Sequence, residues 1–308
     1  MLVQLSRPKD RLRDERERAK LEKRLLRDTG RAIRDHGLIE NGDRILVGMS
    51  GGKDSYTMMR MLTLLQKKAP VKFELVGVCI DQGYRGFRID VVEDWLTDNH
   101  YEHHIETSEF AEIIEAHVPE DGTGCSLCAR LRRGVLYGLA PKLRCNKIAL
   151  GHHADDIIET LMLNLFFNGQ LKAMPIHLTS DAGDNTVIRP LGYCREDDIR
   201  AYAKAMEFPV ISCACKHCGD TSMQRQQVKA MLREMDRKNP GLKTSMMSAL
   251  QCVKPRHLLD RDLVKRLGPP PHPERSLPHP EQALPHPEQA LPHPEQAKRV
   301  EGLAERES

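Results

Sequence analysis

Two spacings of apolar residues alternate along this chain. Short, largely apolar runs have the length and composition of β-strands, and they begin at Arg44, Phe73, Tyr101, Lys147 and Thr186. Between these runs, apolar residues recur three or four positions apart, which predicts helices around residues 58–65, 90–99, 125–139 and 155–167. Strands that alternate with helices indicate an α/β fold, in which a parallel sheet is covered by helices on both faces.

The two ends of the chain depart from this alternation. Residues 7 to about 40 are highly charged with a thin apolar stripe, which predicts a helix that Gly42 ends. From Leu277, the heptapeptide LPHPEQA occurs three times in succession. Two prolines in every unit exclude a helix or a central strand, so this part should be extended and disordered. We therefore expect a helical N-terminal arm, a central catalytic domain and a disordered tail, with the bounds 1–42, 43–266 and 267–308.

Composition narrows the class of protein. Of the 308 residues, 40% are hydrophobic and 30% are charged, and the net charge is +3, which is typical of a soluble globular protein. No apolar run approaches the ~20 residues that span a membrane. The N-terminus carries charges where a signal peptide has its apolar core. We therefore expect a cytoplasmic protein with no membrane contact.

A glycine-rich loop joins the first strand to the following helix. Its sequence is Gly48-Met-Ser-Gly-Gly-Lys-Asp-Ser55. The glycines allow the backbone to approach a ligand closely, the helix N-terminus offers unpaired N–H groups, and Lys53 adds a positive charge. This combination predicts a site for an anion, most simply a phosphate chain, although the loop lacks the Walker A pattern. The carboxylate of Asp54 suggests a bridging magnesium ion. The alternative is an ordinary turn in which Asp54 or Ser55 caps the helix.

A second polar turn follows the strand that begins at Lys147. The sequence GHHADDIIET starts at Gly151 and places three acidic side chains where a helix begins, namely Asp155, Asp156 and Glu159. The carboxyl ends of parallel strands meet at one edge of a sheet, where ligands bind. We therefore expect this turn and the glycine-rich loop to meet at that edge, with a carboxylate of the Asp155–Asp156 pair available to magnesium. The alternative is that the acids only complement the helix dipole.

The cysteines fall into a paired pattern. Cys125 and Cys128 form one C-x-x-C pair, and Cys215 and Cys218 form another, with Cys213 just before it. In a cytosolic protein such pairs indicate metal binding or thiol chemistry rather than disulfides. The spacing allows a zinc site, an iron–sulfur cluster or a catalytic thiol pair. The other cysteines stand alone and should be small buried hydrophobes: Cys79, Cys145, Cys194 and Cys252.

Cations cluster just after the first pair, including Arg130, Arg132 and Arg133. They predict a surface for RNA phosphates, with a solvated helix face as the simpler alternative.

Five segments together resemble one family, the bacterial tRNA 2-thiocytidine synthetases among the PP-loop ATP pyrophosphatases. They read GMSGGKDSYTM, CSLCARLRRG, LGHHADDIIETLMLNLFFNGQLKAMP, VIRPLGYCREDDI and CKHCG followed by QRQQVKAMLREMDRKNPG. Their order and spacing make the match specific, and it covers roughly residues 30 to 260. The resemblance implies ATP-dependent 2-thiolation of cytidine 32 in the tRNA anticodon loop. The C2 oxygen would be adenylated with release of pyrophosphate, and sulfur would then replace it.

The resemblance also implies cofactors, partners and residue roles. These are ATP, Mg²⁺ and a [4Fe–4S] cluster, a tRNA substrate, a cysteine desulfurase or other persulfide donor, and a homodimer. Lys53 and Asp54 would be catalytic, and the nucleotide would be bound by Ser50, Gly51, Gly52, Lys53, Asp54, Ser55, Gly151 and Asp155. The cluster ligands would be Cys125, Cys128 and Cys218. The stretch after Cys218 departs by one residue from the expected length, so Cys215 and then Cys213 are the next candidates.

Two alternatives remain open from the sequence. One is another PP-loop tRNA-modifying enzyme, of the thiouridine synthase or lysidine synthetase type; a lysidine synthetase needs no cysteine cluster. The other is a zinc-stabilised RNA-binding module, which needs no ATP site. The sequence also leaves open whether sulfur travels on the cluster or as a cysteine persulfide.

Overall fold

The computed structural model describes residues 8–118, 124–180, 183, 185–212 and 224–268. By its internal contacts the chain divides into two compact units, Met1–Cys252 and Val253–Ser308. In the second unit, the described residues form a 3₁₀ helix, η1 (Pro255–His257), and α10 (Arg261–Arg266). The predicted tail from residue 267 lies almost entirely outside the described residues, and its boundary near residue 266 stays a prediction.

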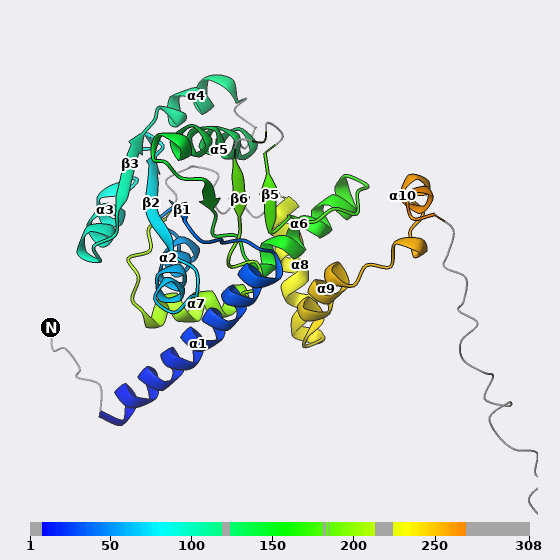
Figure 1. Cartoon of the computed structure of the whole chain (residues 1–308), viewed down its shortest axis with the longest axis horizontal. Coiled ribbons are helices and arrows are strands. Elements are labelled where there is room, and N and C mark those ends of the chain that lie inside the picture. Colours follow the sequence, from blue (N-terminus) through cyan, green and yellow to red (C-terminus); the bar gives the residue numbers. More distant parts are fainter. Residues whose placement is uncertain (1–7, 119–123, 181–182, 184, 213–223, 269–308) are drawn as a thin grey trace, which may run out of the picture. The chain divides into compact units, whose positions relative to one another are not determined.

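A six-stranded sheet forms the centre of the first unit (Figure 1). Its strands are β1 (Asp43–Met49), β2 (Phe73–Asp81), β3 (His103–Thr107), β4 (Lys147–Ala149), β5 (His177–Thr179) and β6 (Thr186–Ile188). Their order is β3-β2-β1-β4-β6-β5, and every neighbouring pair is parallel except β5 with β6. The expectation of a parallel sheet is thus confirmed for five strands, and the sixth, antiparallel edge strand is an addition.

Nine helices of the first unit are described. They are α1 (Pro8–Asp35), α2 (Lys53–Gln66), α3 (Ile89–Asp98), α4 (Phe110–His117), α5 (Cys125–Lys142), α6 (Ala154–Phe167), α7 (Glu196–Ala205), α8 (Gln224–Lys238) and α9 (Leu242–Gln251). None of the described helices is long and apolar enough to cross a bilayer.

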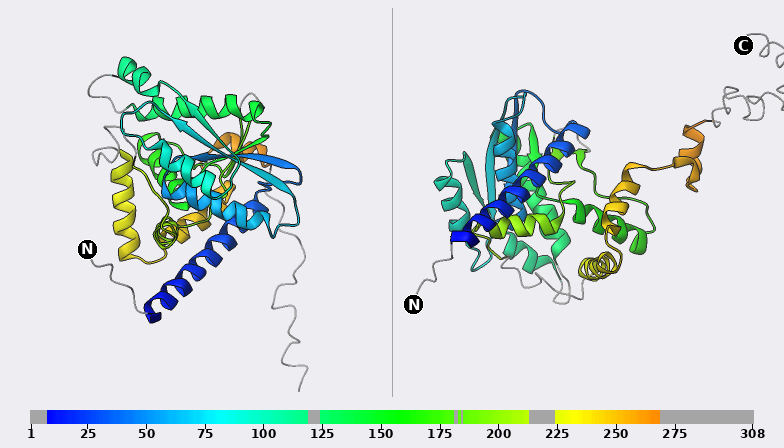
Figure 2. Two further views of the ribbon diagram at one scale, coloured as in Figure 1. Left: turned by 90° about the vertical axis from the view of Figure 1, so that its left-hand side faces the viewer. Right: turned by 90° about the horizontal axis from the view of Figure 1, so that it is seen from below.

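Helices cover both faces of the sheet because the inner strands are apolar on both sides (Figures 1 and 2). Ile45 and Val47 of β1 belong to one core cluster, which also contains buried residues of α1, α2, α3 and α7. Leu46 of β1 and Ile148 of β4 belong to a second cluster, with buried residues of α4 and α5. This arrangement fixes β1 and β4 at the middle of the molecule, and the site lies at their ends.

The N-terminal helix differs from the prediction at its end. α1 stops at Asp35 rather than at Gly42, and residues 38–39 are buried in the core before β1 begins. The helix buries Leu25, Thr29 and Ala32 and contacts α2 and α7. It is therefore part of the first compact unit.

Candidate active site

The site begins where the sheet order reverses. β2 lies on one side of β1 and β4 lies on the other, and Val47 of β1 is in register with Ala149 of β4. The loops that follow these two strands are the glycine-rich loop and the turn at Gly151, so the predicted meeting of the two turns is confirmed. A β-carbon on Gly151 would lie only 3.3 Å from the backbone carbonyl carbon of Asp54. Glycine is therefore what lets the two loops pack this closely.

The glycine-rich loop leaves the start of α2 without a side-chain cap. Gly51 has a φ of +72°, and Gly52 is the N-cap residue, with no capping side chain. The alternative in which Asp54 or Ser55 caps the helix is therefore wrong. Ser55 instead donates its hydroxyl hydrogen to the carbonyl oxygen of Gly52, at 2.9 Å. A helix N-terminus of this kind carries partial positive charge and favours an anion.

The segment after α7 packs against the loop from outside. The amide of Ile211 donates to the carbonyl oxygen of Gly51 at 3.0 Å. The hydroxyl of Tyr56, in the first turn of α2, donates to the carbonyl oxygen of Pro209 at 3.1 Å. These contacts fix the shape of the loop from a distant part of the chain.

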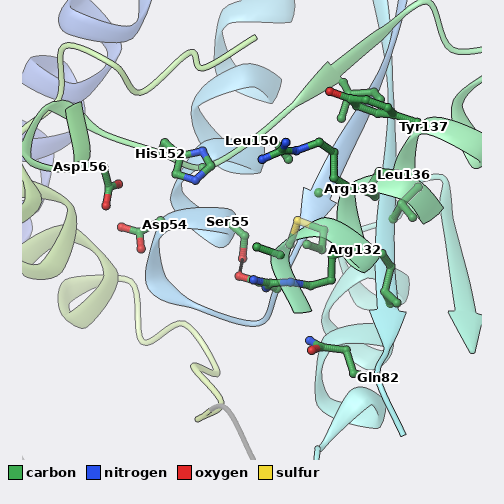
Figure 3. Close-up of a pocket in the computed structure, with 18 of the residues that line it drawn as sticks. Asp54, Ser55, Gln82, Arg132, Arg133, Leu136, Tyr137, Leu150, His152 and Asp156 are labelled. Carbon is green, nitrogen blue, oxygen red and sulfur yellow. Dashed lines mark hydrogen bonds between the residues drawn. The ribbon is translucent and has the colours of Figure 1, made fainter. Parts of the chain in front are cut away.

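A cavity of about 390 Å³ opens beside the two loops (Figure 3). This volume lies within the range of small-molecule sites. Asp54 and Asp156 lie near one another, close to His152, and Arg132 and Arg133 of α5 lie across the cavity from them. The other lining residues include Ser50, Ser55, Gln82, Leu136, Tyr137, Gly151 and Arg225. The carboxylates therefore lie on one side of the cavity, with Arg225 3.6 Å from Asp156, and the two arginines of α5 lie on the other.

Four predicted nucleotide-binding residues do not line this cavity. They are Gly51, Gly52, Lys53 and Asp155. The ammonium group of Lys53 lies 3.0 Å from the Asp54 carboxylate and 3.4 Å from that of Glu196. Burial alone would lower the pKa of Lys53, but these two carboxylates raise it above its ordinary value, so the ammonium stays charged.

Asp155 has its carboxylate oxygens occupied by the protein. One oxygen accepts from the side chain of Lys243 and the other from the backbone amide of Glu196, each at 2.7 Å. Although burial raises its pKa, these two donors lower it below its ordinary value. Of the predicted pair, it is therefore Asp156 that faces the cavity.

Glu196 is a site residue that the sequence analysis missed. Its side chain is 7% exposed and lies 3.0 Å from both Lys229 and Arg200, 3.4 Å from Lys53 and 3.4 Å from Arg233. Burial alone would raise the pKa of Glu196, but the hydrogen bond and charge of Lys229, with the charge of Lys53, hold it far below the ordinary value. In the sequence Glu196 is only an acid in the first turn of a helix, so nothing distinguished it from a dipole-complementing residue.

The adjacent histidines have different surroundings. His152 lines the cavity, and burial lowers its pKa to about 4, so its imidazole is neutral at pH 7. His153 is 3% exposed and starts α6, and its ring nitrogens lie 3.4 Å from Asp156 and 3.6 Å from Asp54. The Nδ1 atom of each imidazole has no hydrogen-bond partner among the described residues.

One member of the first cysteine pair, Cys128, contacts a residue that lines the same cavity. Cys125 starts α5, and Cys128 in its first turn lies with its Sγ 3.2 Å from the Oε1 atom of Gln82, which lines the cavity. A thiol at the position of Cys128 suits a thiolate-bound metal group next to the cavity.

The second pair lies outside the described residues, as does Cys213. Ser212 is the last described residue before this gap, and it follows Ile211, which contacts the glycine-rich loop. Gln224 is the first described residue after the gap, and it precedes Arg225, which lines the cavity. Among the solitary cysteines, Cys79, Cys145 and Cys194 are buried as predicted. Cys252 is exposed at the end of α9, so its predicted burial is wrong.

Comparison with known proteins identifies the family. The model of the PP-loop domain matches residues 20–214, which defines the chain as a PP-loop protein. The chain is 50% identical over 241 residues to the tRNA-cytidine(32) 2-sulfurtransferase of Geobacter sulfurreducens, an alignment that spans 78% of this chain and 94% of the relative. It is 51% identical over 245 residues to the enzyme of the same name from Cupriavidus necator, spanning 79% and 77%. The chain belongs to the tRNA-cytidine(32) 2-sulfurtransferase family, a family of transferases.

A solved structure shares the fold. It is the U34-tRNA thiolase NcsA from Methanococcus maripaludis with its [4Fe-4S] cluster, at a TM-score of 0.58 and 22% identity, covering 76% of this chain and 81% of that one. The predicted PP-loop fold and family resemblance are thus confirmed.

Proposed function

We propose that this protein catalyses the ATP-dependent 2-thiolation of cytidine 32 in the tRNA anticodon loop. One observation carries the proposal: a single cavity is lined by the glycine-rich loop, by the turn at Gly151 and by Gln82, whose Oε1 atom lies 3.2 Å from the Sγ atom of Cys128. An ATP site and a sulfur site that share one cavity suit a reaction in which an adenylated base is attacked by sulfur before water reaches it.

ATP occupies the side of the cavity formed by the two loops. The free N–H groups at the start of α2, with the hydroxyls of Ser50 and Ser55, hold the phosphates. Gly51, Gly52 and Gly151 serve by giving the loops their shape. Asp54 and Asp156 hold Mg²⁺, because both carboxylates face the cavity. Asp155 supports this arrangement through Glu196 and Lys243 rather than by touching the nucleotide.

The chemistry requires a better leaving group at C2 of cytosine. Transfer of AMP to the C2 oxygen forms an O–P bond and breaks the bond between the α- and β-phosphates, which releases pyrophosphate. The charged ammonium of Lys53 stabilises the negative charge that develops on the leaving phosphates. Attack of sulfur on C2 then expels AMP.

Sulfur is delivered from the side of the cavity that lies next to Cys128. Cys125, Cys128 and Cys218 hold a [4Fe–4S] cluster, which supplies or positions the attacking sulfur when bound. A cysteine desulfurase or another persulfide donor provides that sulfur, and a second thiol reduces the persulfide, so that sulfur leaves at the hydrosulfide level and the two thiols form a disulfide. The enzyme works as a homodimer in the cytoplasm. Arg132 and Arg133 line the cavity and balance the charge of an entering RNA phosphate.

The test is thiolation by anaerobically purified protein. With ATP, Mg²⁺, sulfide and a tRNA transcript carrying cytidine 32, mass spectrometry should find 2-thiocytidine, and pyrophosphate should appear in equal amount. The same transcript with uridine 32 is the control and should yield neither product. Incorporation of lysine would indicate a lysidine synthetase, and stoichiometric zinc without pyrophosphate release would indicate an RNA-binding module.

A further inference from the structure

The exposed face of α1 carries a continuous stripe of cations. At 100° per residue, eight Lys and Arg residues between positions 13 and 34 fall within an arc of about 100°. They are Arg13, Arg16, Lys20, Lys23, Arg24, Arg27, Arg31 and Arg34. All eight are exposed, and every other residue of that span, including all of its acids, lies outside the arc. The stripe extends about 32 Å along the helix, with at least one cation per turn.

From Leu21 onward this stripe points away from the protein core, whereas residues 12–20 are exposed on every side of the helix. The opposite side of α1 holds its buried residues, Leu25, Thr29 and Ala32, which pack in the first unit with α2 and α7. Only one other cation in the span, Arg18, lies on that opposite side. A random placement of nine cations would not leave eight of them on one face, so the pattern points to a partner with a row of negative charges.

Six of the eight cations, all except Arg24 and Arg31, remain available to such a partner. Lys20 pairs with Glu17 at 2.7 Å, Arg27 with Asp28 at 2.9 Å and Arg34 with Asp35 at 3.3 Å, and the basic partner is about 70% exposed in each pair. Exposed pairs of this kind contribute only ~0–1 kcal/mol, so phosphates can replace them. Arg24 pairs with Asp198 of α7, and Arg31 lies over the ring of Tyr193, so these two also fix the helix on the body.

We infer that this stripe, which we call the α1 stripe, binds the sugar–phosphate backbone of the tRNA substrate outside the anticodon loop. The inference rests on the proposed function, which supplies the polyanion. A membrane surface is a poorer partner, because helices that bind bilayers need an exposed apolar face, and here that face is used against α2 and α7. The PP-loop domain match begins at residue 20, so the first part of the stripe precedes the matched domain.

The test measures tRNA binding and its salt dependence with the full chain. The variant Arg13→Gln/Arg16→Gln/Lys20→Gln removes three cations and keeps good helix formers. The control Lys67→Gln/Lys68→Gln/Lys72→Gln removes three exposed lysines elsewhere. Each lost phosphate contact lowers the slope of log K against log salt by about 1. We expect the stripe variant to bind tRNA roughly tenfold more weakly near 0.15 M salt with a slope smaller by about 3, while its KM for ATP and its circular dichroism stay unchanged.

The outcomes separate this inference from the proposed function. Equal affinity and slope in the stripe variant and the lysine control would overturn the α1 stripe, even if both proteins thiolate cytidine 32. Binding of the full chain to anionic vesicles that is lost in the stripe variant, with tRNA binding unchanged, would assign the stripe to membranes instead. Failure of the unmodified protein to thiolate any tRNA would overturn the proposed function. A further variant, Arg13→Lys/Arg16→Lys, keeps both charges. Its slope of log K against log salt should therefore stay close to that of the unmodified protein.

Discussion

The two sides of the cavity are built from different kinds of sequence. The nucleotide side consists of two short loops that follow neighbouring strands, β1 and β4, and their places are fixed by strand register. The sulfur side takes Cys128 and Arg132 from α5, whereas Arg225 from the start of the distant α8 lies 3.6 Å from Asp156 of the nucleotide side. Chemistry carried by one contiguous loop can be recognised locally, whereas chemistry shared between distant helices depends on the whole fold. The following experiments test that contrast.

Removing a cluster thiol should have the largest effect. We expect Cys125→Ser, Cys128→Ser and Cys218→Ser each to abolish thiolation and to remove the iron–sulfur absorbance. The reason is that the two remaining cysteine thiolates are too few to hold the cluster. Cys252→Ser is the matched control, since Cys252 is exposed at the end of α9 and should keep both properties. If Cys218→Ser retains a full cluster and Cys215→Ser loses it, the third ligand is Cys215.

On the nucleotide side, the lysine of the loop should matter for rate and not for the cluster. Lys53→Ala removes the charge that we propose stabilises the departing pyrophosphate, and such a loss typically costs about 3 kcal/mol of transition-state stabilisation, or roughly a hundredfold in rate. The rate of pyrophosphate release in the presence of tRNA measures this loss. Iron content should stay unchanged, which would show that the cluster is intact. Near-normal release would remove Lys53 from the catalytic residues; Lys67→Ala, at the other end of α2, should be silent.

A third experiment concerns the charge network behind the loop. Glu196→Gln leaves Lys53 and Lys229 without their buried partner, so we expect a loss of about 2–3 kcal/mol in unfolding free energy at pH 7. Because the folded pKa of Glu196 is depressed, its contribution is present above its ordinary value of 4.5 and declines as pH falls below it. Urea unfolding should therefore show that the difference in unfolding free energy between the unmodified protein and Glu196→Gln becomes smaller from pH 7 to pH 3.5. A difference that does not change with pH would contradict this assignment.

The contact between the two loops can be tested with one methyl group. In Gly151→Ala the new methyl meets the backbone of Asp54, so the loops must separate, at a cost of about 1–2 kcal/mol. That should raise the KM for ATP roughly tenfold. Gly138→Ala is the control, because this exposed position in α5 has open space and should gain about 0.5–1 kcal/mol in stability. An unchanged KM in Gly151→Ala would mean that the close approach is not needed for nucleotide binding.

The smallest effect is expected from the repeats. Two prolines in every seven residues leave little to bury, so truncation after Pro269 should leave melting temperature, iron content and thiolation rate close to those of the full chain. A tenfold drop in activity would contradict the boundary predicted near residue 266.

The sequence predicted the fold where periodicity was strong. β2 begins at the predicted residue, Phe73, and α2 ends next to the predicted residue 65, because buried strands and amphipathic helices have clear patterns. The start of α2 was predicted too late, because Lys53 to Tyr56 belong to the glycine-rich motif and carry no clear apolar stripe. β5 was missed because its three residues are all exposed and give no alternation. The end of α1 was misplaced because Gly42 looked like a helix stop, although the chain had already left the helix to bury Leu38 and Ile39.

The residues of the candidate site also differed in how well the sequence predicted them. Asp54 and Gly151 were placed correctly because they lie in turns that follow parallel strands. Asp155 and Asp156 could not be told apart, since which of two neighbouring carboxylates faces the cavity depends on Lys243 in α9. Glu196 could not be recognised from the sequence, because the cations that surround its carboxylate come from distant parts of the chain and meet only in the folded protein.

The contacts that Pro209 and Ile211 make with the loop also bear on how the protein is made. Tyr56 and Pro209 are 153 positions apart, so the hydrogen bond between them closes late in synthesis and late in folding. A growing chain that has already emerged past α2 still lacks Ile211, whose amide donates to the carbonyl oxygen of Gly51. Nucleotide binding therefore follows completion of most of the first unit, and a nascent chain gains no stabilisation from ATP until α7 and the residues behind it have folded onto α2.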